Sequence, residues 1–159
     1  MKVTILAVGR IREKYFKDGI AEYAKRLRRF CDFSIIEVDD ETAPEKLSEA
    51  EMRIVKRKEA DRLAKHIDKN AYVIAMEVKG RRFSSEMLAD HINDCMNRGR
   101  GNIVFLIGGS NGLDEDLSRS ADIAISVSDM TFPHQLMRLL LSEQIYRAFK
   151  IINHETYHK

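Results

Sequence analysis

Residues 103–107, Ile-Val-Phe-Leu-Ile, form an apolar run that ends directly in a glycine cluster at Gly108, Gly109 and Gly112. A short apolar run rich in β-branched residues is typical of a strand buried on both faces of a parallel sheet. Ligands of such sheets bind beyond the carboxyl ends of the strands, and glycine lets backbone approach a ligand closely. The sequence therefore predicts a parallel sheet with a ligand site at this strand end. A plain tight turn is the alternative.

The spacing of these glycines differs from that of the two common phosphate-binding loops. No Lys-Ser or Lys-Thr pair follows Gly112, which a P-loop requires. The pattern Gly108-Gly109-x-x-Gly112 also differs from the dinucleotide-binding fingerprint. The loop is therefore a candidate binding site that belongs to neither of these classes.

Strand-like apolar runs alternate with helical periodicity along the chain. Apolar residues from Phe16 to Phe30 recur at steps of three and four, which predicts a helix with one face on the sheet. A charged helix is expected near residues 49–65, and Ser84 is a candidate N-cap for a helix that ends at about Asn97. This alternation predicts an α/β fold, a mainly parallel sheet of about five strands with helices on both faces. The expected strands cover residues 3–8, 33–38, 72–76, 103–107 and 123–127.

Length and composition limit the class of protein. With 159 residues the chain is expected to be one domain spanning 1–159, long enough to bury a core without disulfides. Cys31 and Cys95 lack CxxC spacing, which argues against a disulfide framework or a zinc knuckle. No apolar stretch reaches the roughly 20 residues of a membrane span, so we expect a soluble, cytoplasmic protein without membrane contact. The net charge is only +2, so any nucleic-acid contact must come from local clusters of cations.

Residues 126–135 form a second strand end, which leads through a loop into a long apolar helix. Pro133 is expected in the first turn of that helix, where its missing N–H is not needed. Because apolar residues surround most of the helix, it must be buried on more than one side. We expect the second cover to be another subunit of a homodimer; a central helix of a monomer core is the alternative. These residues are Leu136, Met137, Leu139, Leu140, Leu141, Ile145, Ala148 and Ile152.

Polar side chains within this apolar helix need partners, because an unpaired buried charge is costly. Arg138, Gln144 and Arg147 are expected to line a site at the subunit boundary. His134 is a further candidate, since it lies at the turn from the loop into the helix, although simple solvation of a helix terminus also explains it.

The chain ends in His154-Glu-Thr-Tyr-His158, which matches the HExxH zinc motif. On a helix this spacing places two imidazoles on one face, with the Glu as the base of a zinc hydrolase. Only Lys159 follows, so no third ligand comes from downstream, and chain ends fray unless other residues hold them. We therefore attribute the match to chance and expect no metal, with a zinc hydrolase as a minor alternative.

Four separated motifs, in order along the chain, carry a resemblance to a known family. They are residues 105–112 (Phe-Leu-Ile-Gly-Gly-Ser-Asn-Gly), 130–138 (Met-Thr-Phe-Pro-His-Gln-Leu-Met-Arg), 143–148 (Glu-Gln-Ile-Tyr-Arg-Ala) and 157–159 (Tyr-His-Lys). With the matching length, they resemble the ribosomal RNA large subunit methyltransferase H family of the SPOUT class. The resemblance implies S-adenosylmethionine as the cofactor and two subunits that complete the active site. It also implies a C-terminal trefoil knot, with knot and cofactor site within about residues 103–159.

The activity implied by the resemblance is methylation of N3 of a pseudouridine in 23S ribosomal RNA, with the assembled ribosome as the substrate. The cofactor would contact residue 76, the glycine loop and the segment 127–132. The family commonly has Leu where this chain has Met76, and both side chains can contact an adenine ring. The implied cofactor-binding residues are Met76, Gly108, Gly109, Val127, Ser128, Asp129, Met130, Thr131 and Phe132.

The attacking nitrogen carries a proton, so a base or a cation that favours the anion should assist the transfer. His158, Arg138 and Arg147 are the candidates for this role, and Tyr157 is a candidate for stacking on the target base. A non-catalytic nucleotide-binding module is the main alternative function, because it would use the same glycine loop without needing the tail.

Overall fold

A parallel sheet forms the centre of the protein in the computed structural model, which describes residues 1–159. The strands are β1 (Lys2–Val8), β2 (Asp32–Val38), β3 (Tyr72–Arg82), β4 (Asn102–Ile107) and β5 (Ile123–Ser126). Their order across the five-stranded sheet is β2-β1-β4-β3-β5, and every neighbouring pair is parallel. The parallel sheet expected from the sequence is thus confirmed.

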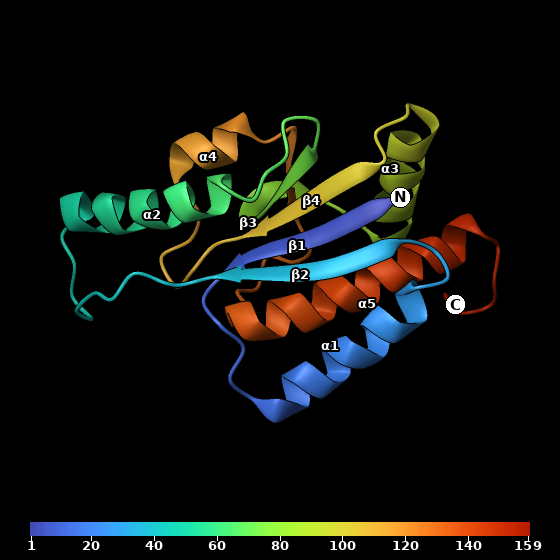
Figure 1. Cartoon of the computed structure of the whole chain (residues 1–159), viewed down its shortest axis with the longest axis horizontal. Helices are drawn as coiled ribbons and strands as arrows, with labels where there is room; N and C mark the ends of the chain where they lie inside the picture. Colours follow the sequence, from blue (N-terminus) through green and yellow to red (C-terminus); the bar gives the residue numbers. More distant parts are fainter.

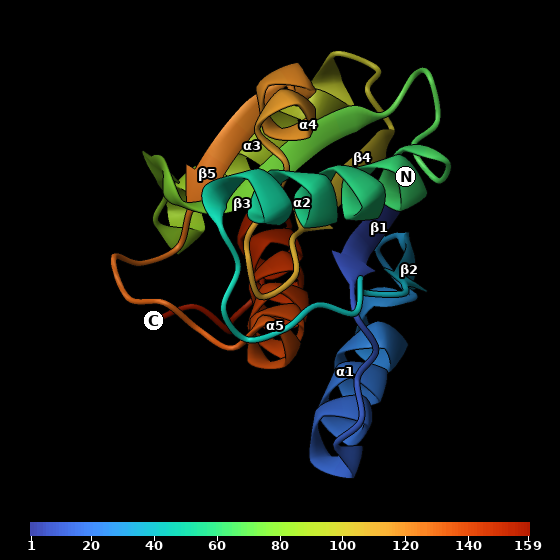
Figure 2. The same ribbon diagram turned by 90° about the vertical axis from the view of Figure 1, so that its left-hand side faces the viewer.

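Helices cover both faces of this sheet (Figure 1). They are α1 (Lys14–Leu27), α2 (Glu49–Ala64), α3 (Ser85–Asn97), α4 (Glu115–Ser120) and α5 (His134–Ile152). Helices α1, α3 and α5 pack on one face, and α2 and α4 pack on the other. The turned view in Figure 2 separates α1 and α5 from α2 and α4 in the same way. The two-sided covering expected from the sequence is therefore confirmed.

Strand β1 shows how one apolar run supplies two cores. Its side chains alternate between the faces of the sheet, as the period of two in a strand requires. Val3 and Ile5 belong to the core beneath α1, α3 and α5, whereas Leu6 and Val8 belong to the core beneath α2. All four side chains are at most 1 % exposed. Burial on both faces explains why the run is continuously apolar.

Three boundaries differ from those expected. Strand β3 continues to Arg82 instead of ending near Met76, because it pairs again with β5 after an irregularity between Met76 and Arg81. Helix α1 ends at Leu27, before Phe30. Pro133 is the N-cap of α5 and not part of its first turn, since its ψ of 136° is extended.

The short helix α4 was not expected from the sequence. Asp114 caps it, with its carboxylate accepting hydrogen bonds from the N–H groups of Asp116 and Leu117 at 3.0 Å each. A helix of this length is too short to show a hydrophobic period, so the cap is the signal that could have revealed it.

Every residue of α5 is buried or half-buried within the single chain. The sheet, α1 and α3 provide this cover: Phe149 stacks on Phe30 with ring centroids 5.6 Å apart, and Leu139 lies against Gly19 of α1. Much of the apolar arc that suggested a second subunit is therefore covered by the chain itself. The homodimer stays a proposal that needs other support.

Cys31 and Cys95 are both buried and unpaired, as their spacing indicated. None of the helices combines the length and the apolar character needed to cross a lipid bilayer.

Arg138 on α5 has the largest fully buried side chain in the molecule, at 0 % exposure. Its Nη1 donates to Glu37 at the end of β2 at 2.8 Å, and its Nη2 donates to the carbonyl of Val8 at the end of β1 at 2.5 Å. Glu37 also accepts from the N–H of Ile11 at 3.1 Å. The partners that the buried charge of Arg138 needs are therefore supplied within its own chain.

We expect Glu37→Gln to lower the free energy of unfolding by about 3 kcal/mol, because it leaves a buried guanidinium without a counter-charge. The amide oxygen still accepts a hydrogen bond, which places the cost at the lower end for a broken buried pair. Urea unfolding at fixed protein concentration measures it. The control is Glu22→Gln, which breaks an exposed pair with Arg26 and should cost less than about 1 kcal/mol. Equal losses in the two variants would contradict this role of the buried pair.

Candidate functional site

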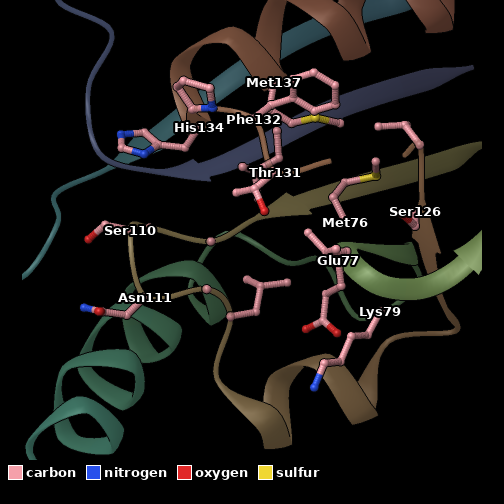
Figure 3. Close-up of a pocket in the computed structure, with 18 of the residues that line it drawn as sticks. Met76, Glu77, Lys79, Ser110, Asn111, Ser126, Thr131, Phe132, His134 and Met137 are labelled. Atoms are coloured by element: carbon pink, nitrogen blue, oxygen red, sulfur yellow. The ribbon is translucent and has the colours of Figure 1, made fainter. Parts of the chain in front are cut away.

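A cavity of about 930 Å³ opens at the carboxyl edge of the sheet. Three segments enclose it: the glycine loop (108–112), the loop between β5 and α5 (126–133), and residues 76–79 of β3 (Figure 3). Its volume is within the range of about 300–1,000 Å³ usual for small-molecule sites. The position is the one expected for a ligand site in an open parallel sheet.

The glycine loop folds back on itself directly after β4. A Cβ on Gly108 would lie 2.5 Å from the carbonyl carbon of Gly112 and 2.6 Å from the nitrogen of Leu113. Gly112 has a φ of +84°, and its N–H donates to the carbonyl of Gly109 at 3.0 Å. Gly108 is therefore needed for the loop to close on its own backbone. This reason differs from the close approach to a ligand that the sequence suggested.

The rest of the pocket wall is largely apolar. Ile107 and Ile125 line it near the ends of β4 and β5, and Figure 3 shows Met76, Phe132 and Met137 on the side away from Ser110 of the glycine loop. Thioether and aromatic side chains of this kind suit contact with a flat ring.

Two hydroxyl groups order the loop that leads to α5. Ser126 donates to the carbonyl of Ser128 at 2.8 Å, and the Ser128 hydroxyl accepts from the N–H of Met130 at 3.0 Å. Asp129 is absent from the lining of the cavity and pairs with Arg82 of β3. Met130 is 73 % exposed at the mouth of the pocket. The loop thus has a defined shape, with an apolar side chain presented to solvent.

The candidate cofactor-binding residues from the sequence come together in this pocket, with one exception. Asp129 does not line the cavity. His134 also lines it, as its position at the start of α5 suggested. The lining residues among those named from the sequence are Met76, Gly108, Gly109, Val127, Ser128, Met130, Thr131 and Phe132.

The candidate catalytic residues do not line the pocket of their own chain. Arg138 is buried beside it, as described above. Arg147 donates twice to Glu143, at 3.0 and 2.6 Å, and the hydroxyl of Tyr157 donates to the same oxygen at 3.1 Å. His158 lies between Arg147, at 3.3 Å from Nδ1, and Glu86 of α3, at 2.7 Å from Nε2. The tail is thus fastened along α5 instead of fraying.

The HExxH match lies outside any helix, because α5 ends at Ile152 and His154 has a φ of 54°. The helical spacing that would align its two imidazoles is therefore lacking. No group of three or more His, Cys, Asp or Glu side chains in the chain is arranged to hold a metal ion.

Burial shifts the pKa values of two site residues. It raises the pKa of Tyr157, and the neighbouring hydroxyl of Tyr23 and carboxylate of Glu143 add to this, so the phenol stays protonated. Burial, assisted by the charge of Arg138, lowers the pKa of His134, so its imidazole is neutral near pH 7. Tyr157 can therefore donate a hydrogen bond but not serve as a base, whereas His134 can accept a proton.

Glu59 lies next to the glycine loop, and the sequence analysis did not identify it. It is 5 % exposed on the inner face of α2, and its Oε1 accepts from the N–H of Glu41 at 3.0 Å. Its Oε2 has no hydrogen-bond partner and would lie 3.1 Å from a Cβ on Gly109. The carboxyl thus supports the glycine loop from behind. An acid on the apolar side of a helix, between Val55 and Leu63, is the signal that could have found it.

Comparisons with known proteins agree with this architecture. A family model described as a predicted SPOUT methyltransferase matches residues 1–158. Proteins named ribosomal RNA large subunit methyltransferase H are 50 % identical to the chain in Acetivibrio thermocellus and 52 % identical in Bifidobacterium adolescentis, over 100 % of both chains in each case.

Two solved structures share the fold at low sequence identity. A probable methylase family protein from Haemophilus influenzae has a TM-score of 0.53 at 12 % identity, covering 99 % of this chain and 70 % of that one. The tRNA (m1G37) methyltransferase from Aquifex aeolicus has a TM-score of 0.52 at 14 % identity, covering 92 % of this chain and 70 % of that one. The fold and the family model define the class, that of the SPOUT methyltransferases. Within this class the chain belongs to the ribosomal RNA large subunit methyltransferase H family, which its four motifs resemble.

Replacement of the buried acid should change how stability depends on pH. Burial raises the pKa of Glu59 in the folded state above its unfolded value of about 4.3, so its stabilising contribution is lost as the pH rises through the folded pKa. Glu59→Gln cannot ionise, so its free energy of unfolding should rise relative to that of the wild type as the pH increases above about 4. Chemical denaturation at a series of pH values from about 4 upward measures this difference. Exposed Glu49→Gln is the control, and parallel pH profiles for wild type and Glu59→Gln would refute the expectation.

Proposed function

We propose that the protein transfers a methyl group from S-adenosylmethionine to N3 of a pseudouridine in 23S ribosomal RNA, with the assembled ribosome as the substrate. One observation carries the proposal. A chain about half identical over its full length to named ribosomal RNA methyltransferases has a pocket at the carboxyl edge of its sheet, lined by all but one of the residues that the family resemblance assigns to the cofactor.

The pocket suits S-adenosylmethionine in size and chemistry. Met76, Phe132 and Met137 provide apolar contact for an adenine ring, and the closed glycine loop presents backbone on the opposite side. Glu77 adds a carboxylate to the wall, which suits a ligand with a positively charged sulfonium. When bound, the cofactor supplies an electrophilic methyl group. The residues of the chain then have to position the target nitrogen and remove its proton.

His158 is our candidate for the base, and Tyr157 for the contact to the target base. The imidazole of His158 is held between Arg147 and Glu86, which orients it, and the raised pKa of Tyr157 keeps its hydroxyl a donor. Arg138 is fully buried and paired, so we assign it a positioning role through β1 and β2 instead of a catalytic one. Arg147, paired with Glu143, would orient His158.

We further propose that the active unit is a homodimer in which the tail of one subunit reaches the pocket of the other. Neither Tyr157 nor His158 lines the pocket of its own chain, so a second copy would bring the reacting groups together. A C-terminal trefoil knot within about residues 103–159 of the single domain is part of the same proposal, since the family implies it. A ribosomal substrate would place the protein in the cytoplasm.

The assembled ribosome is a better candidate substrate than free RNA. The net charge of the chain is only +2, so it would attract an unstructured polyanion such as free RNA only weakly. A small enzyme of this kind needs a structured surface to select one nucleotide. A nucleotide-binding module without catalysis remains the second candidate, because the pocket alone would serve it.

The deciding experiment is labelled-methyl transfer from S-adenosylmethionine to ribosomes from a strain that lacks the protein. We expect label in one pseudouridine of 23S RNA, and faster labelling of ribosomes than of free large-subunit RNA. Cofactor binding without any transfer would favour the binding module. A hydrolytic activity that requires stoichiometric zinc, in place of methyl transfer, would favour a zinc hydrolase.

Gly108→Ala should weaken S-adenosylmethionine binding tenfold or more while the fold survives. The added Cβ would lie 2.5 Å from backbone, so the glycine loop has to move. Calorimetry measures the affinity, and circular dichroism checks the fold. Gly101→Ala is the matched control, because nothing lies within 4 Å of a Cβ at that position. If Gly108→Ala bound S-adenosylmethionine with wild-type affinity, the glycine loop would not be part of the binding site.

His158→Ala should lower the rate of methyl transfer on ribosomes by about 10²-fold or more, because acid-base assistance is lost. Cofactor affinity and dimerisation should change little, and the exposed His66→Ala serves as the control. Tyr157→Phe tests the hydroxyl separately. Mixed dimers of Gly108→Ala and His158→Ala subunits should regain activity if the tail acts on the pocket of its partner. Wild-type turnover by His158→Ala would move the role of base to His134.

A further inference from the structure

The end of β3 carries a cluster of cations next to the pocket that no step above uses. Lys79, Arg81 and Arg82 lie within four consecutive residues, and all three side chains are exposed. We call these three residues the basic ridge. Lys79 and its neighbour Val78 also line the cavity, so the ridge begins at the pocket wall.

Gly80 gives the ridge its shape. A Cβ at Gly80 would lie 2.6 Å from the carbonyl carbon of Ile125 and 2.8 Å from its nitrogen, so only glycine lets β3 press against the backbone of β5 here. The pairing of the two strands is irregular between Met76 and Arg81. The residues between these positions leave the regular ladder, which turns Val78 and Lys79 outward at the mouth of the pocket.

The charges on the ridge are mostly free to bind another molecule. Lys79 and Arg81 form no ion pair in the chain; Arg81 lies over the ring of Phe83, 5.6 Å from its centroid. Arg82 pairs with Asp129 of the loop between β5 and α5. The carboxylates on the same rim are Glu77 and Glu115, of which Glu115 pairs with Arg119.

The ridge differs from part of the cationic surface of α2. There, Arg57, Lys58 and Arg62 are each engaged with carboxylates of the chain, whereas Arg53 and Lys56 form no ion pair, and Lys56 lines the same cavity. The mouth of the pocket also exposes two apolar side chains beside the ridge, Val78 at 49 % and Met130 at 73 %. Free cations beside exposed apolar groups fit an RNA strand, which offers phosphates together with unstacked bases.

We propose that the basic ridge binds phosphates of the RNA strand on either side of the nucleotide that enters the pocket. Contacts of this kind set the register of a nucleic acid without reading its sequence. Lys79 at the wall and Arg81 beyond it would thus hold the strand while the target base faces the cofactor. This inference rests on the proposed function and extends it from the substrate class to the surface that receives the substrate.

The test compares the variant Arg81→Gln, whose side chain does not line the cavity, with the wild type in binding to vacant ribosomes and in methyl transfer. We expect a KM for ribosomes raised several-fold, an unchanged kcat, and a slope of log affinity against log salt reduced by about 0.7 for one lost contact to a single strand. Affinity for S-adenosylmethionine and the oligomeric state should stay as in the wild type. The control Arg53→Gln removes the same charge from an exposed, unpaired position on α2.

Three outcomes would overturn the proposal. One is an unchanged KM and salt slope in the ridge variant. Another is an equal change in the control variant, which would indicate a general effect of charge. The third is loss of the dimer or of cofactor affinity, which would make the ridge a subunit or cofactor contact. Failure of the proposed function would give a different result. The wild-type protein would then transfer no methyl group, whereas the ridge variant and the wild type could still be compared in their binding to ribosomes.

Discussion

The buried guanidinium of Arg138 joins the ends of β1 and β2 to the start of α5, and the placement of the pocket depends on this interaction. This charge is tolerated at 0 % exposure because the carboxylate of Glu37 and the carbonyl of Val8 accept hydrogen bonds from the guanidinium. The same contact positions His134, one turn earlier on α5, at the rim of the cavity. The buried guanidinium therefore fixes the start of α5 relative to the ends of β1 and β2, and this sets the position of the site.

The pocket combines segments that are distant in the sequence because the carboxyl ends of parallel strands meet at one edge. Glycine is required at two of these ends for the same physical reason, which is backbone packed against backbone. Gly108 closes its loop on Gly112, and Gly80 brings β3 onto β5. Glu59 supports the first of these loops from α2. The wall is thus preorganised by packing that involves no ligand.

The tail illustrates how a chain end can be ordered without a helix. Tyr157 packs edge-on against Tyr146, with ring centroids 5.0 Å apart, and shares Glu143 with Arg147. Glu155 is paired with Arg29 and Lys150. These contacts hold the tail against α5, where the imidazole of His158 reaches Arg147 and Glu86 of α3. A tail held in this way is suited to act on a neighbouring subunit, as we propose, because its position is set before the subunits meet.

The sequence by itself determined the order and type of nearly all elements and the parallel sheet with two-sided cover, because periodicity and glycine clusters are local signals. The resemblance of its motifs to a known family added most of the pocket lining and the expected chemistry. Only the tertiary structure decided that Arg138 is paired within the chain, that β3 continues to Arg82 and that Glu59 lies behind the glycine loop. Each of these depends on residues far apart in the chain, whose contacts arise when helices and strands pack and leave no trace in local periodicity.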